Sequence, residues 1–307
     1  MFMSAMGGGN LLSSWSTASY VVRAVASKPT GPFTAVQDVL PAFHHNPQVV
    51  RAPDGTFLLF TIGQTLASES QSAGASASGG AVFRTELHYA ADITGPWQSL
   101  GCVINGSNPS PHVMANGTIV VAYKSKPNGL RIATASHWRG PYTTLTQPGA
   151  KNSCCGAASS PASCCGEILL SPMPYGHPYI EDFFLWFDQN AERWAIVLHQ
   201  YELPNRGMGP GGFAYSTDAS LLSPWHLANE SVYGLDIVLA NRSTLHADRQ
   251  RPKLLFDREG KPKFLYNGLD PGGQKAPTHT VVQEIKSWSP PYDTSATRDA
   301  PQTRGAR

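Results

Sequence analysis

Residues 46–60, NPQVVRAPDGTFLLF, decide the fold of this chain, because they join two short apolar strands through a tight turn. Residues 54–55 are an Asp-Gly pair, one of the strongest short-range signals for a β-hairpin. The pattern returns at residues 108–122 as NPSPHVMANGTIVVA, now with an Asn-Gly turn. Two further copies with paired apolar runs follow at 181–199 and 251–266. The chain therefore repeats one strand-turn-strand unit, which is typical of an array of similar sheets.

A second repeated unit lies between these hairpins. It is a strand followed by Gly-Pro-aromatic, at residues 31–33, 95–97 and 140–142, with a degenerate Ser-Pro-Trp copy at 223–225. Together the two units make a four-stranded antiparallel blade, and such blades pack radially as a β-propeller. We predict an all-β fold, a five-bladed β-propeller whose first blade is incomplete at the N-terminus. A β-sandwich or another irregular all-β fold is the alternative.

Composition supports this interpretation and excludes several classes of protein. Charged residues make up 14% of the chain, against roughly 25% in an average soluble domain. The 29 Gly and 25 Pro are too many for a coiled coil or a helical bundle, and 41% hydrophobic residues argue against a disordered chain. The net charge of +2, without a basic block, predicts no nucleic-acid partner. No apolar run approaches the ~20 residues of a membrane span.

The propeller is expected to form a single domain over residues 1–288. Residues 143–178 are expected to be a cysteine-containing insertion between blades, and residues 289–307 a disordered tail. A surface loop tied by disulfides is the preferred interpretation of the insertion, with free thiols and a metal site as alternatives. Its cysteines are Cys154, Cys155, Cys164 and Cys165.

The cellular location is predicted only from weak signals. Residues 1–9 lack the basic start and long apolar stretch of a signal peptide. Asn-X-Ser/Thr sites, which suit a secreted protein, occur at Asn105, Asn116, Asn229 and Asn241. We therefore expect an extracellular or secretory-pathway protein, and we expect it to be a monomer.

Polar residues gather immediately before the apolar inner strands. In a propeller these strand starts converge on one mouth of the central channel, so equivalent positions predict a polar pocket there. The positions are His44-His45-Asn46, Asn108, Glu181-Asp182 and the run Asp248-Arg249-Gln250-Arg251.

Several ordered motifs resemble the five-bladed propellers related to glycoside hydrolase family 43, the arabinanase-like proteins, and in particular their little-characterised eukaryotic branch. The motifs lie at residues 13–33, 45–63, 181–199, 211–218 and 251–268. The resemblance implies an inverting glycosidase with an Asp base, a second Asp that tunes it, and a Glu acid. The acid protonates the leaving oxygen while the base activates water on the opposite face of the sugar.

The chain departs from that pattern at several positions. The resemblance places the base on an opening strand of the first blade that lies beyond the N-terminus, and the next two strand heads carry Asn46 and Asn108. Asp182 stands in an Asp-Pro-like slot, with Phe183 in place of Pro. Gln250 replaces the Glu of an Arg-Glu-Arg-Pro motif, and a glutamine cannot donate a catalytic proton.

The resemblance and the strand positions together select candidate site residues. Asp182 and Glu181 are the candidate catalytic carboxylates, although adjacent strand residues face opposite sides unless a bulge intervenes. The candidate substrate-binding residues are His45, Asn46, Asn108, His199, Arg249, Gln250 and Arg251. No cofactor and no protein-bound metal is predicted; a calcium ion in the channel, held by His279 or by water, is the alternative.

Two functional hypotheses follow. In the first, the chain binds and hydrolyses arabinose-, xylose- or galactose-type glycans at the channel mouth. In the second, it is a non-catalytic propeller that binds carbohydrate or a protein partner, because the acid and base carboxylates are missing.

Overall fold

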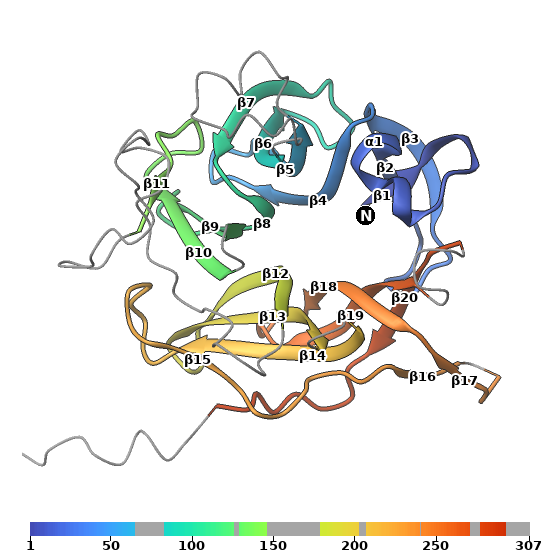
Figure 1. Cartoon of the computed structure of the whole chain (residues 1–307). Helices are drawn as coiled ribbons and strands as arrows, with labels where there is room; N and C mark the ends of the chain where they lie inside the picture. The colour runs from blue at the N-terminus through green and yellow to red at the C-terminus, as the bar shows by residue number, and fades with distance from the viewer. Residues whose placement is uncertain are drawn as a thin grey trace, which may run out of the picture.

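Strands arranged in a ring of five sheets make up nearly all of the regular structure (Figure 1). The computed structural model describes residues 1–64, 83–125, 129–145, 179–202, 207–239, 241–270 and 277–292. The predicted all-β, five-bladed propeller is therefore confirmed. None of the helices in the described segments is long and apolar enough to cross a membrane.

Each sheet is antiparallel, and sequence neighbours pair in order. The first blade contains β1 (Phe2–Met6), β2 (Ser19–Val25) and β3 (Thr34–Leu40), with the short helices η1 (Gly7–Gly9), η2 (Leu12–Ser14) and α1 (Trp15–Ala18) between its first two strands. The second contains β4 (His44–Arg51), β5 (Phe57–Gln64), β6 (Phe83–Ala90) and β7 (Gln98–Ile104). The third contains β8 (Ser107–Val113), β9 (Ile119–Ser125), β10 (Gly129–Ala135) and β11 (Thr143–Thr144). The fourth contains β12 (Tyr179–Asp188), β13 (Arg193–Glu202), β14 (Gly207–Ser216) and β15 (Trp225–Leu227). The fifth contains β18 (Asp248–Phe256), β19 (Pro262–Asp270) and β20 (His279–Glu284), and a separate hairpin of β16 (Asp236–Val238) and β17 (Thr244–His246) precedes it.

The predicted hairpin turns connect the first and second strands of the second and third blades. In the turn between β4 and β5, Gly55 has φ 91°, and the Thr56 amide donates to the Asp54 side chain at 2.9 Å. In the turn between β8 and β9, Gly117 has φ 86°, and the Thr118 amide donates to the Asn116 side chain at 3.0 Å. A positive φ favours glycine, and Asp or Asn stabilises such turns through its side chain, so local chemistry determines both turns.

The first blade lacks one strand position among the described residues. The Gly-Pro corners at 31–32, 95–96 and 140–141 follow β2, β6 and β10, so these three strands are equivalent. By the same alignment, β1 corresponds to β5 and β9, the second strands of their blades. The innermost position of the first blade is therefore not filled by described residues. This agrees with the prediction that the first blade is incomplete.

Apolar clusters lie between neighbouring blades. On β9, Val120 and Ala122 pack toward the fourth blade, whereas Ile119 and Val121 pack toward the second. A strand buried on both faces needs a continuous apolar run, and this explains why the inner repeats are so hydrophobic. Between the first and second blades the buried cluster is much smaller, with Val21, Leu40 and Leu59.

The C-terminal described segment stays in contact with the propeller. The strand β20 pairs with β19 as the third strand of the fifth blade. Tyr292 packs on Phe213 and Tyr215 and donates to Asp188 at 2.7 Å, so ordered contacts extend past residue 288. The cysteine pairs of the predicted insertion and the tail beyond Tyr292 lie outside the described residues.

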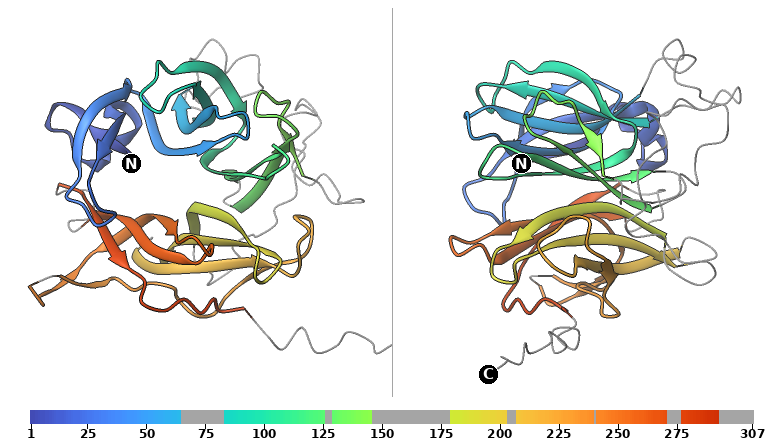
Figure 2. Two further views of the ribbon diagram at one scale, coloured as in Figure 1. Left: turned by 180° about the vertical axis from the view of Figure 1, so that it is seen from behind. Right: turned by 90° about the vertical axis from the view of Figure 1, so that its left-hand side faces the viewer.

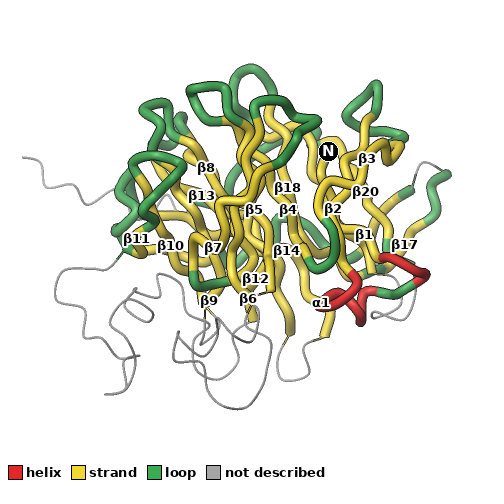
Figure 3. The backbone as a smooth tube through the Cα atoms, turned by 90° about the horizontal axis from the view of Figure 1, so that it is seen from above, coloured by secondary structure: helices red, strands yellow, loops and turns green. Residues whose placement is uncertain are grey.

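The strands β4, β8, β12 and β18 face the centre of the ring, and Figure 2 shows the same ring from behind and from the side. In Figure 3 the short helices lie at one end of the strands. At that end Ser19, directly after α1, donates to the backbone of His44 at 2.9 Å, where β4 begins. This end carries the heads of the inner strands.

Candidate functional site

Four inner strands carry the same backbone distortion near their start. Asn46, Asn108, Asp182 and Arg251 have φ values of 49°, 53°, 55° and 52°, and each lies in a break of the strand register. Such a β-bulge turns its residue away from the regular alternation of faces. Asn and Asp tolerate this left-handed conformation better than most residues do. The bulge at Glu181-Asp182 removes the objection that adjacent strand residues must face opposite sides.

The four bulge side chains bond to one another across the channel. The Asn46 Nδ2 donates to Asn108 Oδ1 at 3.2 Å and to Asp182 Oδ1 at 3.0 Å, and the Asn108 Nδ2 donates to the same Asp182 oxygen at 3.0 Å. The Arg251 amide donates to Asp182 Oδ2 at 3.3 Å, and its guanidinium donates to Asn46 Oδ1. We call this group of Asn46, Asn108, Asp182 and Arg251 the polar ring. Because its members come from four blades, the ring also links the blades at the channel axis.

Asp182 is the only carboxylate of the polar ring and is only 4% exposed. Burial raises its pKa, and the nearby Glu181 adds to this, whereas the Arg251 charge opposes it. The carboxylate accepts three N–H donors, so its buried oxygens have the hydrogen bonds that such groups need.

Glu181 lies beside the ring in a different electrostatic environment. Its carboxylate accepts a hydrogen bond from Lys124 Nζ at 2.6 Å and from the Tyr201 hydroxyl at 2.8 Å. Burial favours a higher pKa, but the Lys124 charge and these two hydrogen bonds outweigh it and hold the pKa of Glu181 below its usual value. Glu181 is therefore ionised at neutral pH. The side chains of Lys124 and Glu181 are 15% and 18% exposed, so they remain accessible from the channel mouth.

His199, Asp248 and Gln250 form a second buried group next to the ring. The His199 Nε2 lies 3.0 Å from Asp248 Oδ1, and the Gln250 Nε2 donates to Asp248 Oδ2 at 2.7 Å. Burial favours a higher pKa for Asp248, but these two partners outweigh it and lower the pKa. Gln250 thus positions Asp248. The residue in the bulge of β18 is Arg251, not Gln250.

His45 is held in one protonation state by its neighbours. Its Nε2 lies 2.7 Å from Arg251 Nη2, which can only donate, so Nε2 accepts and the proton sits on Nδ1. The Nδ1 then donates to the Ser19 hydroxyl at 2.6 Å. Burial and the Arg251 charge hold the pKa of His45 well below its usual value, so the imidazole is neutral.

Arg249 lies apart from the other candidate residues. Its guanidinium donates to the Gly234 carbonyl and to Asn267, and it stacks over the Tyr233 ring at 4.6 Å. These partners belong to the packing around β18 and β19. The structure therefore brings together the other eight candidate residues and places Arg249 in the support of the fifth blade.

Sequence reasoning missed three charged or polar residues of the site. Lys124 and Tyr201 lie on the second strands of their blades. The prediction compared only residues at the starts of the innermost strands, so it did not include them. Lys253 follows the Arg251 bulge by two residues and donates to the Phe183 carbonyl at 3.1 Å. Burial lowers the pKa of Lys253 to about 8. Lys253 could have been found from the sequence, because it lies two residues after Arg251 and so stays on the side of the strand that faces the channel.

A cavity of about 1260 Å³ lies beside the inner strands beyond the ring. Its lining includes Phe2 and Arg23 of the first blade and Gln48, His112 and Lys253 of the inner strands. It borders β1, next to the innermost position that described residues leave unfilled in the first blade.

The channel residues do not fit a calcium ion. Arg251 and Lys253 place two cationic side chains around Asp182, and the oxygens of Asp182 and Glu181 already accept hydrogen bonds from protein donors. His279, the alternative ligand, is exposed on β20. Calcium prefers several uncommitted oxygen ligands, and the described residues of the channel do not supply them.

Comparisons with known proteins identify the fold. No protein-family model matches the chain, and no curated protein sequence matches it. Among solved structures, an endo-arabinase from Bacteroides thetaiotaomicron is similar with a TM-score of 0.53 and 12% identity, covering 95% of this chain and 97% of that one. An endo-1,5-alpha-L-arabinanase from Thermotoga petrophila has a TM-score of 0.54 and 15% identity, over 92% and 70% of the two chains. The GH43 BlXynB protein from Bacillus licheniformis has a TM-score of 0.55 and 10% identity, over 94% of this chain and 50% of its own. The chain has the five-bladed fold of these GH43-type structures.

Proposed function

We propose that this chain binds arabinose-, xylose- or galactose-type glycans at the head of the central channel. The observation that carries the proposal is the convergence of the polar ring with the partly exposed Glu181, Lys124 and Tyr201. Solved structures of the same fold include an endo-1,5-alpha-L-arabinanase and a xylan beta-1,4-xylosidase, and this supports a carbohydrate ligand. A monomeric state and an extracellular or secretory location remain predictions from the sequence.

The chemistry of the channel head suits a sugar. Sugar hydroxyls both donate and accept, so they need clustered donors and acceptors in fixed positions. Glu181 accepts and Lys124 donates, while Asn46 and Arg251 are partly exposed at the ring. Trp15 adds a half-buried aromatic face next to His45, with the ring centroids 5.0 Å apart. Such a face can stack on the apolar side of a sugar ring.

Tyr201→Phe tests the binding proposal because it removes one hydroxyl and changes little else. We expect binding of xylo-, arabino- or galacto-oligosaccharides, measured by isothermal titration calorimetry, to weaken about tenfold, because the charge-assisted hydrogen bond that positions Glu181 is lost. Tyr292→Phe is the matched control, since Tyr292 also donates to a carboxylate, that of Asp188, but at the far end of β12 from Glu181. Equal affinities of the two variants for the sugar would show that it binds elsewhere. If the native protein bound none of these oligosaccharides, the proposal would be wrong.

Hydrolysis of the bound glycan is the second candidate function, and one observation favours it. The environments of the two neighbouring carboxylates push their pKa values apart, lowering that of Glu181 and raising that of Asp182. Opposite shifts of this kind are typical of an acid and base pair.

The spacing of the carboxylates opposes an inverting mechanism. Oxygen atoms of Glu181 and Asp182 lie within 4.8 Å of each other, whereas inverting glycosidases hold their carboxyl groups roughly 6.5–9.5 Å apart. Gln250 stands where the resemblance implies the acid. This spacing and Gln250 together do not favour inverting hydrolysis, and we therefore propose binding without hydrolysis as the first function.

Gln250→Glu distinguishes the two candidate functions. If the native chain binds without hydrolysing, nitrophenyl arabinosides, xylosides and galactosides are stable with the native protein, and Gln250→Glu is the variant in which activity can arise. Turnover by the native protein that is lost in Glu181→Gln and in Asp182→Asn would instead establish the hydrolase. Turnover that survives both substitutions would contradict this assignment of the site.

A further inference from the structure

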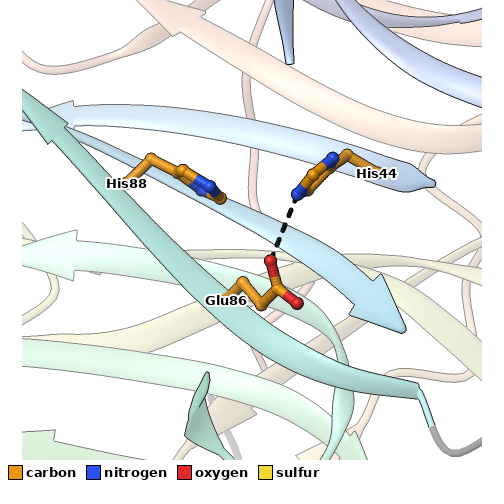
Figure 4. A group of neighbouring side chains, drawn as sticks. All are labelled: His44, Glu86 and His88. Carbon is orange, nitrogen blue, oxygen red and sulfur yellow. Dashed lines mark hydrogen bonds and ion pairs between the residues drawn. The ribbon is translucent and has the colours of Figure 1, made fainter. Parts of the chain in front are cut away.

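Two histidines and a glutamate gather on one face of the second blade, outside the polar ring. His44 begins β4, and Glu86 and His88 lie two residues apart on β6. The register pairs His44 with Gly63, Glu86 with Thr61 and His88 with Leu59, so all three side chains lie on the same face of the sheet. Figure 4 shows the Glu86 carboxylate below the two imidazoles. Single ligand atoms of the three residues lie within 4.8 Å of one another.

A glycine on the intervening strand allows this arrangement. The strand β5 separates β4 from β6, so the Glu86 carboxylate must pass over its backbone to reach His44 Nε2 at 3.1 Å. A Cβ atom at Gly63 would lie 2.0 Å from Cδ and Oε1 of Glu86. Only a residue without a side chain leaves this path open.

His44 is oriented as metal-bound histidines are. Its Nδ1 lies 2.7 Å from the carbonyl oxygen of Pro41, to which it donates. A backbone carbonyl on one ring nitrogen directs the other nitrogen toward the metal. The His44 Nε2 donates to the Glu86 carboxylate at 3.1 Å, and a cation bound by both groups would take the place of that proton.

Two buried polar atoms on this face have no partner. His88 is 6% exposed, and its Nδ1 has no hydrogen-bond partner. The Thr61 Oγ1, on β5 opposite Glu86, is also buried and unpartnered. Leaving buried polar atoms unsatisfied is costly, so a ligand at this face would recover that cost.

We propose that His44, Glu86 and His88 bind a divalent transition-metal ion, with Zn²⁺ the best match. Two imidazoles and one carboxylate are ligands that zinc accepts in tetrahedral sites, and Thr61 or a water would supply the fourth position. The ion would tie the start of β4 to β6 directly beside His45 of the channel head. The site is separate from the proposed glycan site, and its occupancy does not depend on that function.

Zinc affinity of the purified full chain tests the proposal, by competition with a chromogenic chelator. The cysteines are first alkylated with iodoacetamide, because thiolates also bind zinc. We expect one tight zinc equivalent per chain and at least 100-fold weaker binding in Glu86→Gln and in His88→Asn. The matched control is His246→Asn, since His246 pairs with Asp236 at 2.7 Å in an exposed hairpin, and its affinity should equal that of the native chain.

Two further measurements guard against a folding defect. Near-ultraviolet circular dichroism of Glu86→Gln should match the native spectrum, because the substitution keeps the shape of the side chain. Cobalt(II) bound to the native chain should show a d–d spectrum of low-symmetry nitrogen and oxygen coordination, which Glu86→Gln should lose. Absence of a tight zinc equivalent in the native chain, or unchanged affinity in a folded Glu86→Gln, would overturn the proposal.

Discussion

Burial and neighbouring charges change the proton affinity of the charged side chains Asp182 and Lys253 in the channel. Asp182 is buried among N–H donors, and Lys253 lies two residues beyond the Arg251 bulge on β18. Burial lowers the pKa of Lys253 to about 8, with Arg251 adding to this shift and Asp182 opposing it. The folded protein therefore holds the Lys253 proton less tightly than the unfolded chain does, and its charge disfavours the folded state at neutral pH.

The stability of the protein should rise with pH because of Lys253. Between about pH 8 and pH 10.5 the unfolded chain binds the proton that the folded protein has released, so the free energy of unfolding increases across that range. In Lys253→Met this contribution is absent. As the pH rises from about 8 to 10.5, the free energy of unfolding of the native chain should therefore increase by about 1–3 kcal/mol more than that of Lys253→Met. Urea unfolding at pH 7, 8, 9 and 10 measures it.

Lys263→Met is the control for this prediction, because Lys263 is exposed on β19. Its difference from the native chain should stay constant with pH. A constant difference for Lys253→Met as well would show that Lys253 holds its proton as firmly in the folded protein as in the unfolded chain.

At the scale of single elements, hairpin turns determine strand pairing and bulges determine where side chains point. The turn at Asn116-Gly117 closes β8 onto β9, with the Met114 amide donating to the Thr118 carbonyl at 2.8 Å. The bulge at Asn108, on the same β8, turns that side chain toward Asp182. One strand thus carries a fold-determining turn at one end and a site-determining bulge at the other.

Gly117→Ala should destabilise the protein through backbone strain alone. Gly117 has φ 86°, and a Cβ there would meet only Pro53 Cγ, at 3.9 Å. The left-handed conformation costs a non-glycine residue about 1–2 kcal/mol, and we expect that loss in the free energy of unfolding. Gly234→Ala is the matched control, since a Cβ at Gly234 meets nothing within 4 Å and its φ is not left-handed. Equal stabilities of the two variants would contradict the strain argument.

At the scale of the whole molecule, the five blades are not held equally. Continuous apolar clusters join the second blade to the third, the third to the fourth and the fourth to the fifth. The first blade contributes the buried Val21 and Leu40 and the partly buried Phe2 and Val39 to a small cluster with the second. On its other side, the contacts with the fifth blade include the Tyr266 hydroxyl, which donates to the Pro29 carbonyl at 2.8 Å in an exposed position.

The first blade should therefore open more readily than the third. Hydrogen exchange measured by mass spectrometry compares β2 with β9, since each is paired on both sides within its blade. We expect the amides of β2 to exchange at least tenfold faster, because local opening follows the amount of buried apolar contact. Equal protection of the two strands would mean that the polar ring and the strand pairing stabilise the first blade as firmly as an apolar interface does.

Short-range turn chemistry, which can be recognised in the sequence, sets the strand pairing within the blades. Asp54-Gly55, Asn116-Gly117 and the Gly-Pro corners act within a few residues, so their turn chemistry can be recognised without knowing what surrounds them. The heads of the inner strands were predictable as a group for the same reason, because they stand at fixed positions in each repeat.

Which side chains meet depends on how the blades pack in the closed ring. Four bulges bring Asn46, Asn108, Asp182 and Arg251 together, whereas Gln250 bonds to Asp248 beside them. Contacts between blades, such as Lys124 with Glu181, and across a strand, such as Glu86 with His44 over Gly63, depend on register and on the packing of separate sheets. These are long-range properties of the closed ring, and no short stretch of sequence contains them.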